Sequence, residues 1–150
     1  NLTVYDNLKC ILEFKNLSKN EIENKIENLL KEFEIENLKD RKGKFLSGGE
    51  KRRVEIARAL TINPKFILLD EPFSGIDPIA VEEIKNIIRQ LKEKNIGILI
   101  TDHNVKETLS ITDYSYILHR GNIIYSGIAD NIYKNEKVKK YYLGEKFNKK

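Results

Sequence analysis

A glycine-rich loop, Leu46–Glu50 (LSGGE), leads directly into the basic helical stretch Lys51–Leu60. Ser47 can cap this helix and Glu50 lies three residues on, which is the pattern of a capping box. Glycines let the backbone approach a ligand closely, and a helix start offers free N–H groups at the positive end of its dipole. The loop therefore predicts an anion site, although any helix can begin in this way and the loop alone does not decide.

Two other stretches end in residues suited to metal and phosphate chemistry. The apolar run Phe66–Leu69 leads into Asp70 and Glu71, and the run Ile96–Thr101 precedes His103 by one residue. Runs of this kind are typical of strands buried on both faces, and ligands bind at the carboxyl ends of parallel strands. Two adjacent ionised carboxylates repel each other unless a cation lies nearby, and at such strand ends that cation is commonly a metal ion bound together with phosphate. A purely structural interpretation is also possible, in which Asp70 and Glu71 simply end a strand and His103 caps a helix. The convergence of three motifs on one chemistry disfavours it.

Helices are predicted on both sides of the glycine loop. Thr3 and Ser18 each precede an acidic residue by three positions, which predicts two further capping boxes. Lys39–Lys44 is expected to be a polar linker. Apolar residues recur at helical spacing after each cap, namely Val4, Leu8, Ile11 and Leu12 in the first helix and Ile22, Ile26, Leu29, Leu30 and Phe33 in the second.

The pattern changes at Asn63-Pro64, where strands begin to alternate with helices. Asp77 as N-cap and Pro78 at the first helical position predict a helix with Ile84, Ile87, Ile88 and Leu91 on its buried face. This alternation predicts an α/β fold with a mainly parallel sheet. The elements expected after the second strand are a short helix over Val105–Leu109, a hairpin from Tyr114–His119 and Ile123–Ser126 around Gly121-Asn122, and terminal helices over Ile128–Tyr133 and Val138–Leu143.

The composition restricts the classes of function. The net charge is +4, but acidic residues are interspersed with the lysines and only the tail Lys146–Lys150 is a basic run, so no nucleic-acid partner is expected. Cys10 is the single cysteine, which excludes a disulfide framework or zinc cluster and fits a reducing cytosol. No apolar run approaches membrane-spanning length. The chain has no Met, so a preceding N-terminal part is expected to be missing.

In their order and spacing these motifs resemble the ATP-binding-cassette ATPases. Leu46–Glu50 resembles the signature loop of that family, Phe66–Glu71 its Walker B strand, Ser74–Asp77 its D-loop and His103 its switch histidine. The resemblance implies part of a P-loop NTPase domain. Residues 1–62 would form the helical subdomain with the signature loop, and residues 63–150 the C-terminal part of the RecA-like parallel-sheet core.

The resemblance also implies ATP and Mg²⁺ as cofactors and a role for each motif residue. Asp70 would hold Mg²⁺, largely through water. Glu71 would orient and deprotonate the attacking water, and His103 would contact the γ-phosphate and that water. The remaining expected site residues act between two head-to-tail copies of the chain: Ser47, Gly48, Gly49 and Glu50 at the γ-phosphate of the other copy, and Ser74 and Asp77 at the dimer interface.

A narrower resemblance, to the ATPase subunits of bacterial lipopolysaccharide exporters, is carried by Leu2–Leu8, Arg53–Leu60, Thr101–Leu109 and Tyr141–Glu145. It implies transmembrane permease partners and a peripheral place on the cytoplasmic face of the inner membrane. Three alternatives remain: the ATPase of a branched-chain amino acid importer, a soluble cassette protein acting on nucleic acid or ribosomes, and a truncated remnant without function.

The Walker A loop of the family has no counterpart in these residues, because no glycine-rich phosphate loop ending in Lys and Ser or Thr is present. The chain alone is therefore expected to be inactive. The strand Phe66–Leu69 is expected to have unpaired edges and exposed apolar surface.

Overall fold

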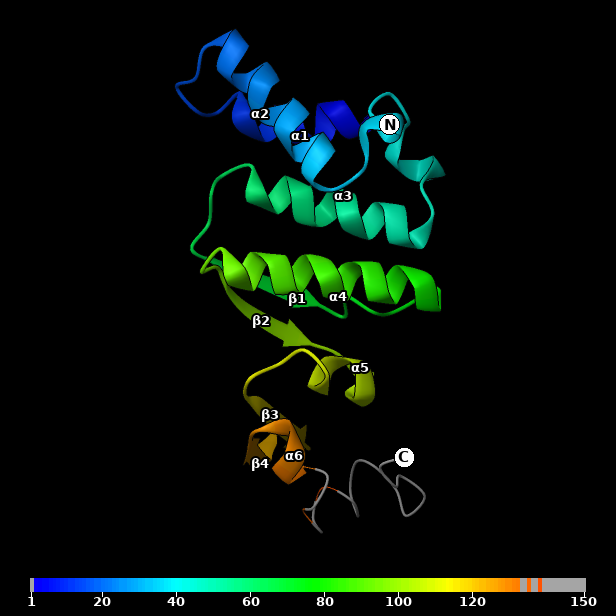
Figure 1. The fold of residues 1–150 in the computed structure, drawn as a ribbon, viewed down its shortest axis with the longest axis vertical. Helices are drawn as coiled ribbons and strands as arrows, with labels where there is room; N and C mark the ends of the chain where they lie inside the picture. Colours follow the sequence, from blue (N-terminus) through cyan, green and yellow to red (C-terminus); the bar gives the residue numbers. More distant parts are fainter. Residues whose placement is uncertain (1, 133–134, 136–137, 139–150) are drawn as a thin grey trace. The chain divides into compact units, whose positions relative to one another are not determined.

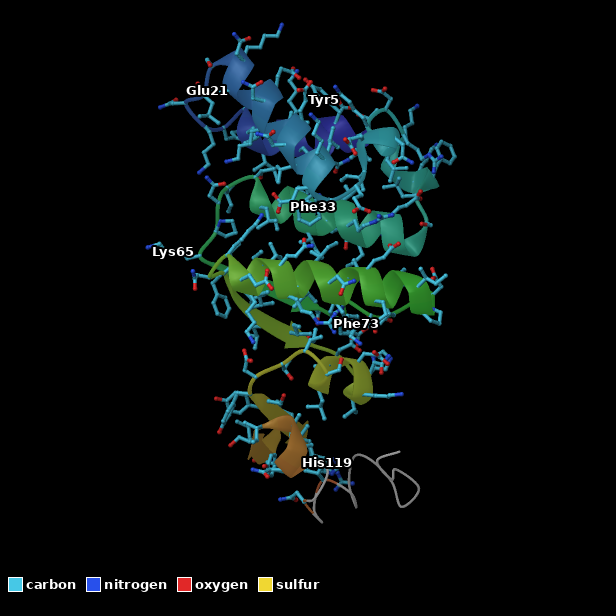
Figure 2. The ribbon with its side chains drawn as sticks, viewed as in Figure 1. Tyr5, Glu21, Phe33, Lys65, Phe73 and His119 are labelled. Carbon is cyan, nitrogen blue, oxygen red and sulfur yellow. The ribbon has the colours of Figure 1, made fainter. Side chains whose placement is uncertain are left out.

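The computed structural model describes residues 2–132, 135 and 138 (Figure 1). The chain divides into two compact units, Asn1–His103 and Asn104–Lys150. The predicted tail Lys146–Lys150 lies outside the described residues, and so does the predicted helix Val138–Leu143 apart from its first residue. The predicted division into residues 1–62 and 63–150 distinguishes family subdomains, and it stays a prediction.

The first unit begins with the helices α1 (Val4–Leu12) and α2 (Lys19–Glu32), followed by α3 (Gly48–Leu60). All three predicted capping boxes are confirmed. The N-cap side chain accepts a hydrogen bond from the third helical N–H in each case, and the acidic side chain at that position accepts one from the N-cap N–H. Local sequence therefore determines where these helices start.

The predicted apolar stripes form the helical core. Val4, Leu8 and Leu12 of α1 are buried, and only Ile11 remains partly exposed. The predicted residues of α2 are buried as well, together with Phe33 after its end. α1 packs against α2 and α3.

The predicted linker Lys39–Lys44 follows the short 3₁₀ turn η1 (Glu36–Leu38) and runs into a second one, η2 (Gly43–Phe45). It is anchored to the start of α1. The Val4 N–H donates to the Arg41 carbonyl at 3.0 Å, and the Gly43 N–H donates to the Leu2 carbonyl at 3.0 Å. The segment before the glycine loop is therefore held by backbone hydrogen bonds.

The strands β1 (Phe66–Asp70) and β2 (Gly97–Thr101) pair in parallel, and helix α4 (Pro78–Glu93) connects them. α4 begins at the predicted cap, where the Asp77 carboxylate accepts hydrogen bonds from the N–H groups of Ile79 and Ala80, both at 3.0 Å. It packs against α3 on one side and β2 on the other (Figure 1). The predicted strand–helix–strand unit with parallel pairing is confirmed.

The prediction that both strands are buried on both faces was wrong. Ile67 is 5% exposed, but Phe66 is 54% and Leu68 71% exposed, and Leu99 on β2 is 46% exposed. Side chains alternate between the two faces of a strand, and in the described part of the chain one face of this pair is packed while the other is open. The expected exposed apolar surface along Phe66–Leu69 is thus present at Phe66 and Leu68.

The second unit contains α5 (Val105–Leu109), β3 (Ser115–His119), β4 (Asn122–Gly127) and, within the described residues, α6 (Ala129–Ile132). The predicted hairpin is confirmed, with its turn one residue earlier than expected. Arg120 and Gly121 have φ angles of 48° and 77°, and positive φ at both central residues matches the twist of a tight hairpin. Asn122 is therefore the first residue of β4. The core of this unit consists of Leu109, Ile117, Ile132 and Val138.

No helix in the described ranges has both the length and the apolar character needed to span a bilayer.

Candidate functional site

The acidic pair and the histidine lie at the same edge of the parallel strands. Asp70 pairs with Thr101 at the last position of the ladder, so the residues that follow the two strands emerge side by side. His103 Nδ1 lies 3.5 Å from Glu71 Oε1. Both side chains are exposed, at 70% and 55%. The fold therefore brings the two predicted catalytic residues together where solvent and a ligand can reach them.

Asp70 lies beside oxygen donors that suit Mg²⁺. The Thr101 hydroxyl donates a hydrogen bond to Asp70 Oδ1, and both residues lie at the carboxyl ends of their strands. The described residues contain no group of three or more His, Cys, Asp or Glu side chains arranged to hold a metal ion. Mg²⁺ commonly binds through one or two carboxylates plus substrate phosphate and water, so this donor set fits a magnesium–phosphate complex.

Glu71 has an unusual backbone conformation that its neighbours maintain. Its φ angle is 46°, and a non-glycine residue there is strained by about 1–3 kcal/mol. The Glu71 N–H donates to the Thr101 carbonyl at 2.7 Å. Its carbonyl accepts from the Arg52 guanidinium and from the Ser74 N–H, both at 3.1 Å. Contacts from β2, from α3 and from the following turn thus fix this residue.

The glycine loop packs tightly against the first turn of α4 and the turn before it. A Cβ on Gly48 would lie 2.9 Å from the Gly75 carbonyl oxygen, and a Cβ on Gly49 would lie 2.7 Å from the Ala80 Cβ. Real Cβ atoms do not approach this closely, so both positions require glycine for packing within the chain. Sequence reasoning assigned these glycines only to ligand approach and missed this second role. Gly48 is itself exposed, and Gly49 is buried.

The charged residues of this loop and turn are stabilised as anions. The Ser47 N–H donates to Glu50 at 2.7 Å, and this hydrogen bond lowers the pKa of Glu50. Arg41 forms an ion pair with Glu50 at 3.3 Å. The pKa of Asp77 is lowered chiefly by the hydrogen bond from the Ala80 N–H. Both carboxylates therefore serve as helix caps, at positions where the helix dipole also favours negative charge.

The predicted site residues thus fall into two groups. Asp70, Glu71 and His103 meet at the strand ends, whereas Ser47–Glu50 contacts the turn that contains Ser74–Asp77. Three further residues join these groups and were missed from the sequence: Arg52, Thr101 and Asp102. Thr101 and Asp102 could have been found, because they adjoin His103 at a strand end opposite the acidic pair.

Comparison with known proteins agrees with the motifs. Residues 1–74 match the ABC transporter family. An ATP-binding cassette of an ABC transporter, solved in its ADP conformation, superimposes with a TM-score of 0.80 at 32% identity, covering 96% of this chain and 63% of that one. These matches confirm the predicted resemblance: in sequence and fold the chain is similar to ATP-binding-cassette proteins of ABC transporters.

Two curated relatives are similar to nearly the whole of this chain. The lipopolysaccharide export system ATP-binding protein LptB of Haemophilus influenzae is 52% identical over 147 residues, 97% of this chain. LptB of Escherichia coli strain K12 is 53% identical over the same length. The chain spans 61% of the length of each relative.

Proposed function

We propose that this chain serves in the ATPase subunit of an ABC transporter that exports lipopolysaccharide. The observation that carries ATP hydrolysis is the 3.5 Å approach of Glu71 Oε1 to His103 Nδ1 at the carboxyl ends of parallel strands. The identity of about half the residues with two LptB proteins supports the transported substrate. The subunit would then work on the cytoplasmic face of the inner membrane, bound to transmembrane permease subunits.

Each group at the strand ends has a separate task in this proposal. Asp70 would hold Mg²⁺, which would supply charge neutralisation at the phosphates. Glu71 is the general base that takes a proton from the attacking water, and its exposed carboxylate is free of the cap contacts that occupy Glu50 and Asp77. His103 orients the water and the γ-phosphate. Positioning and charge stabilisation provide most of the catalysis in phosphoryl transfer.

The glycine loop acts on a second copy in the same proposal. Ser47, Gly48 and Gly49 begin α3, where free N–H groups favour phosphate, and Gly48 is exposed. Glu50 holds the loop in place by accepting the hydrogen bond from the Ser47 N–H. Ser74 and Asp77 lie on the adjoining turn and would face the other copy. ATP is then held between two head-to-tail copies of the chain.

The test is ATP hydrolysis by the subunit expressed from its complete reading frame, together with its membrane subunits in proteoliposomes. Replacing Glu71 by Gln removes the base while keeping its shape, and loss of a general base lowers the rate by about 10²–10⁴-fold. Nucleotide binding should persist. A Glu71→Gln variant that hydrolyses ATP at the wild-type rate would refute this assignment of the base.

Transport is measured separately, as ATP-dependent release of lipopolysaccharide from the same vesicles. Hydrolysis that is stimulated by branched-chain amino acids and their binding protein, or co-purification with ribosomes or RNA, would overturn the substrate assignment and leave the ATPase assignment standing. Residues 1–150 alone should release phosphate only at background, since the P-loop Lys and its glycines are not among them.

A further inference from the structure

Asp102 is a buried carboxylate beside the proposed catalytic pair. Its side chain is 0% exposed, although it directly precedes His103, which is largely exposed. Its Oδ2 accepts a hydrogen bond from the Phe73 N–H at 3.0 Å, and Phe73 is itself 4% exposed. Burying a carboxylate is unfavourable unless it is hydrogen-bonded or paired, so this position calls for a specific reason.

The hydrogen bond extends the pairing of the two strands past their ends. The last ladder pair is Asp70 with Thr101. Beyond it, the Glu71 N–H donates to the Thr101 carbonyl at 2.7 Å, and the Phe73 N–H donates to Asp102. Glu71 and Phe73, which follow β1, are therefore tied to Thr101, the last residue of β2, and to Asp102 directly after it. Glu71 is thus held directly by the first hydrogen bond, and the second holds the turn two residues further on.

The second oxygen of the same carboxylate faces the histidine. Asp102 Oδ1 lies 3.8 Å from His103 Nδ1, and Glu71 Oε1 lies 3.5 Å from that atom. Nδ1 therefore lies near two carboxylates, while the His103 side chain as a whole is 70% exposed. One buried side chain thus contacts the backbone that carries the base and adjoins the ring of its partner.

We propose that Asp102 is a positioning residue that fixes the turn Glu71–Phe73 and the direction of the His103 ring, and so sets their approach for hydrolysis. The expected effect on the rate of hydrolysis rests on the proposed function, whereas the anchoring of the turn by Asp102 does not. The carboxylate acts through two other residues and does not touch the nucleotide.

Three variants of the subunit, expressed from its complete reading frame and assembled with its membrane subunits, test this proposal. Asp102→Ala removes both contacts, whereas Asp102→Asn keeps an acceptor for the Phe73 N–H. Thr61→Ala is the matched control, because Thr61 is 1% exposed and its hydroxyl donates to the Arg58 carbonyl at 2.7 Å, outside the proposed site.

Misplacing a catalytic group by about 1 Å costs up to ~10²-fold in rate, so Asp102→Ala should lower kcat by about 10–10²-fold with the KM for ATP within about twofold. Asp102→Asn should recover much of that loss. Thr61→Ala should lose stability and keep its kcat. A wild-type kcat in Asp102→Ala, or a kcat loss in Thr61→Ala as large as in Asp102→Ala, would overturn the proposal.

Hydrogen exchange at the Phe73 amide provides a readout that needs no activity. This amide should be protected in the wild type and in Asp102→Asn, and should exchange at least about fivefold faster in Asp102→Ala. An unprotected Phe73 amide in the wild-type protein would overturn the inference, even if none of the variants folds. A wild type that lacks ATPase activity but protects this amide defeats the proposed function and leaves the anchor intact.

Discussion

Adding a single methyl group at Gly49 tests whether the glycine loop is built for packing as well as for a ligand. A Cβ on Gly49 would lie 2.7 Å from the Cβ of Ala80 in α4, and Gly49 is buried. Gly43 is the matched control, since its nearest neighbour to a new Cβ is the Leu2 carbonyl oxygen at 3.9 Å. Neither glycine has a positive φ, so backbone strain enters neither substitution.

The expected magnitude follows from two opposing effects. Overpacking a tight contact costs about 1–3 kcal/mol. Alanine in place of glycine at a compatible backbone position gains about 0.4–1 kcal/mol. Gly43→Ala should therefore be neutral or slightly stabilising, and Gly49→Ala should be less stable than Gly43→Ala by about 1–3 kcal/mol, which is the clash alone.

Urea unfolding of the two variants measures this difference, and a double mutant tests its cause. Ala80→Gly removes the opposing Cβ. Combining it with Gly49→Ala should therefore restore most of the stability lost to the clash and give a coupling energy of about 1–2 kcal/mol. Equal stabilities of Gly49→Ala and Gly43→Ala would refute the packing role. If the double mutant regains stability but not ATP hydrolysis, the glycine also serves the nucleotide, as proposed above.

Three further predictions use matched residues. Ser47→Ala and Ser18→Ala each remove one capping box and should each cost about 0.5–2 kcal/mol in thermal unfolding, but only Ser47→Ala should lower ATP hydrolysis. The lowered pKa of Asp77, from a usual value of 3.8, contributes stability that is complete above that value and is lost as pH falls through the folded pKa. Melting between pH 5 and pH 2.5 should therefore be less acid-sensitive in Asp77→Asn, and an unchanged profile contradicts this. In residues 1–150, Ile67→Ala should cost about 2–5 kcal/mol and the exposed Leu68→Ala under about 0.5 kcal/mol, as measured by urea unfolding.

Much of the local structure was predictable because its causes are local. The caps at Thr3, Ser18 and Ser47 depend on side chains three residues apart, and the structure has all three. The cap at Asp77 followed by Pro78 determines the start of α4 in the same way. The site motifs also depend on short spacings, so the meeting of Glu71 and His103 could be expected once both were placed at the ends of parallel strands.

Burial of the strands could not be predicted from their apolar residues. Ile67 and Leu68 are adjacent and equally apolar, yet they are 5% and 71% exposed. Which face of a strand is covered depends on the elements packed on it, and α4 is the helix packed on this pair. The Arg52 contact to the Glu71 carbonyl was equally hidden, because it joins residues 19 positions apart whose approach depends on the packing of α3.

Helix α3 connects the two parts of the proposed site. Of its first residues, Gly48 lies against the turn before α4 and Gly49 against Ala80 in α4. One turn further along, Arg52 donates to the carbonyl of Glu71. The start of this helix and the Glu71 backbone are therefore linked through the Arg52 side chain. A phosphate at the helix start, as proposed above, would contact the same helix that holds the carbonyl of the proposed base. For this reason the spacing between the glycine loop and Arg52 matters as much to the proposed chemistry as the residues of either motif.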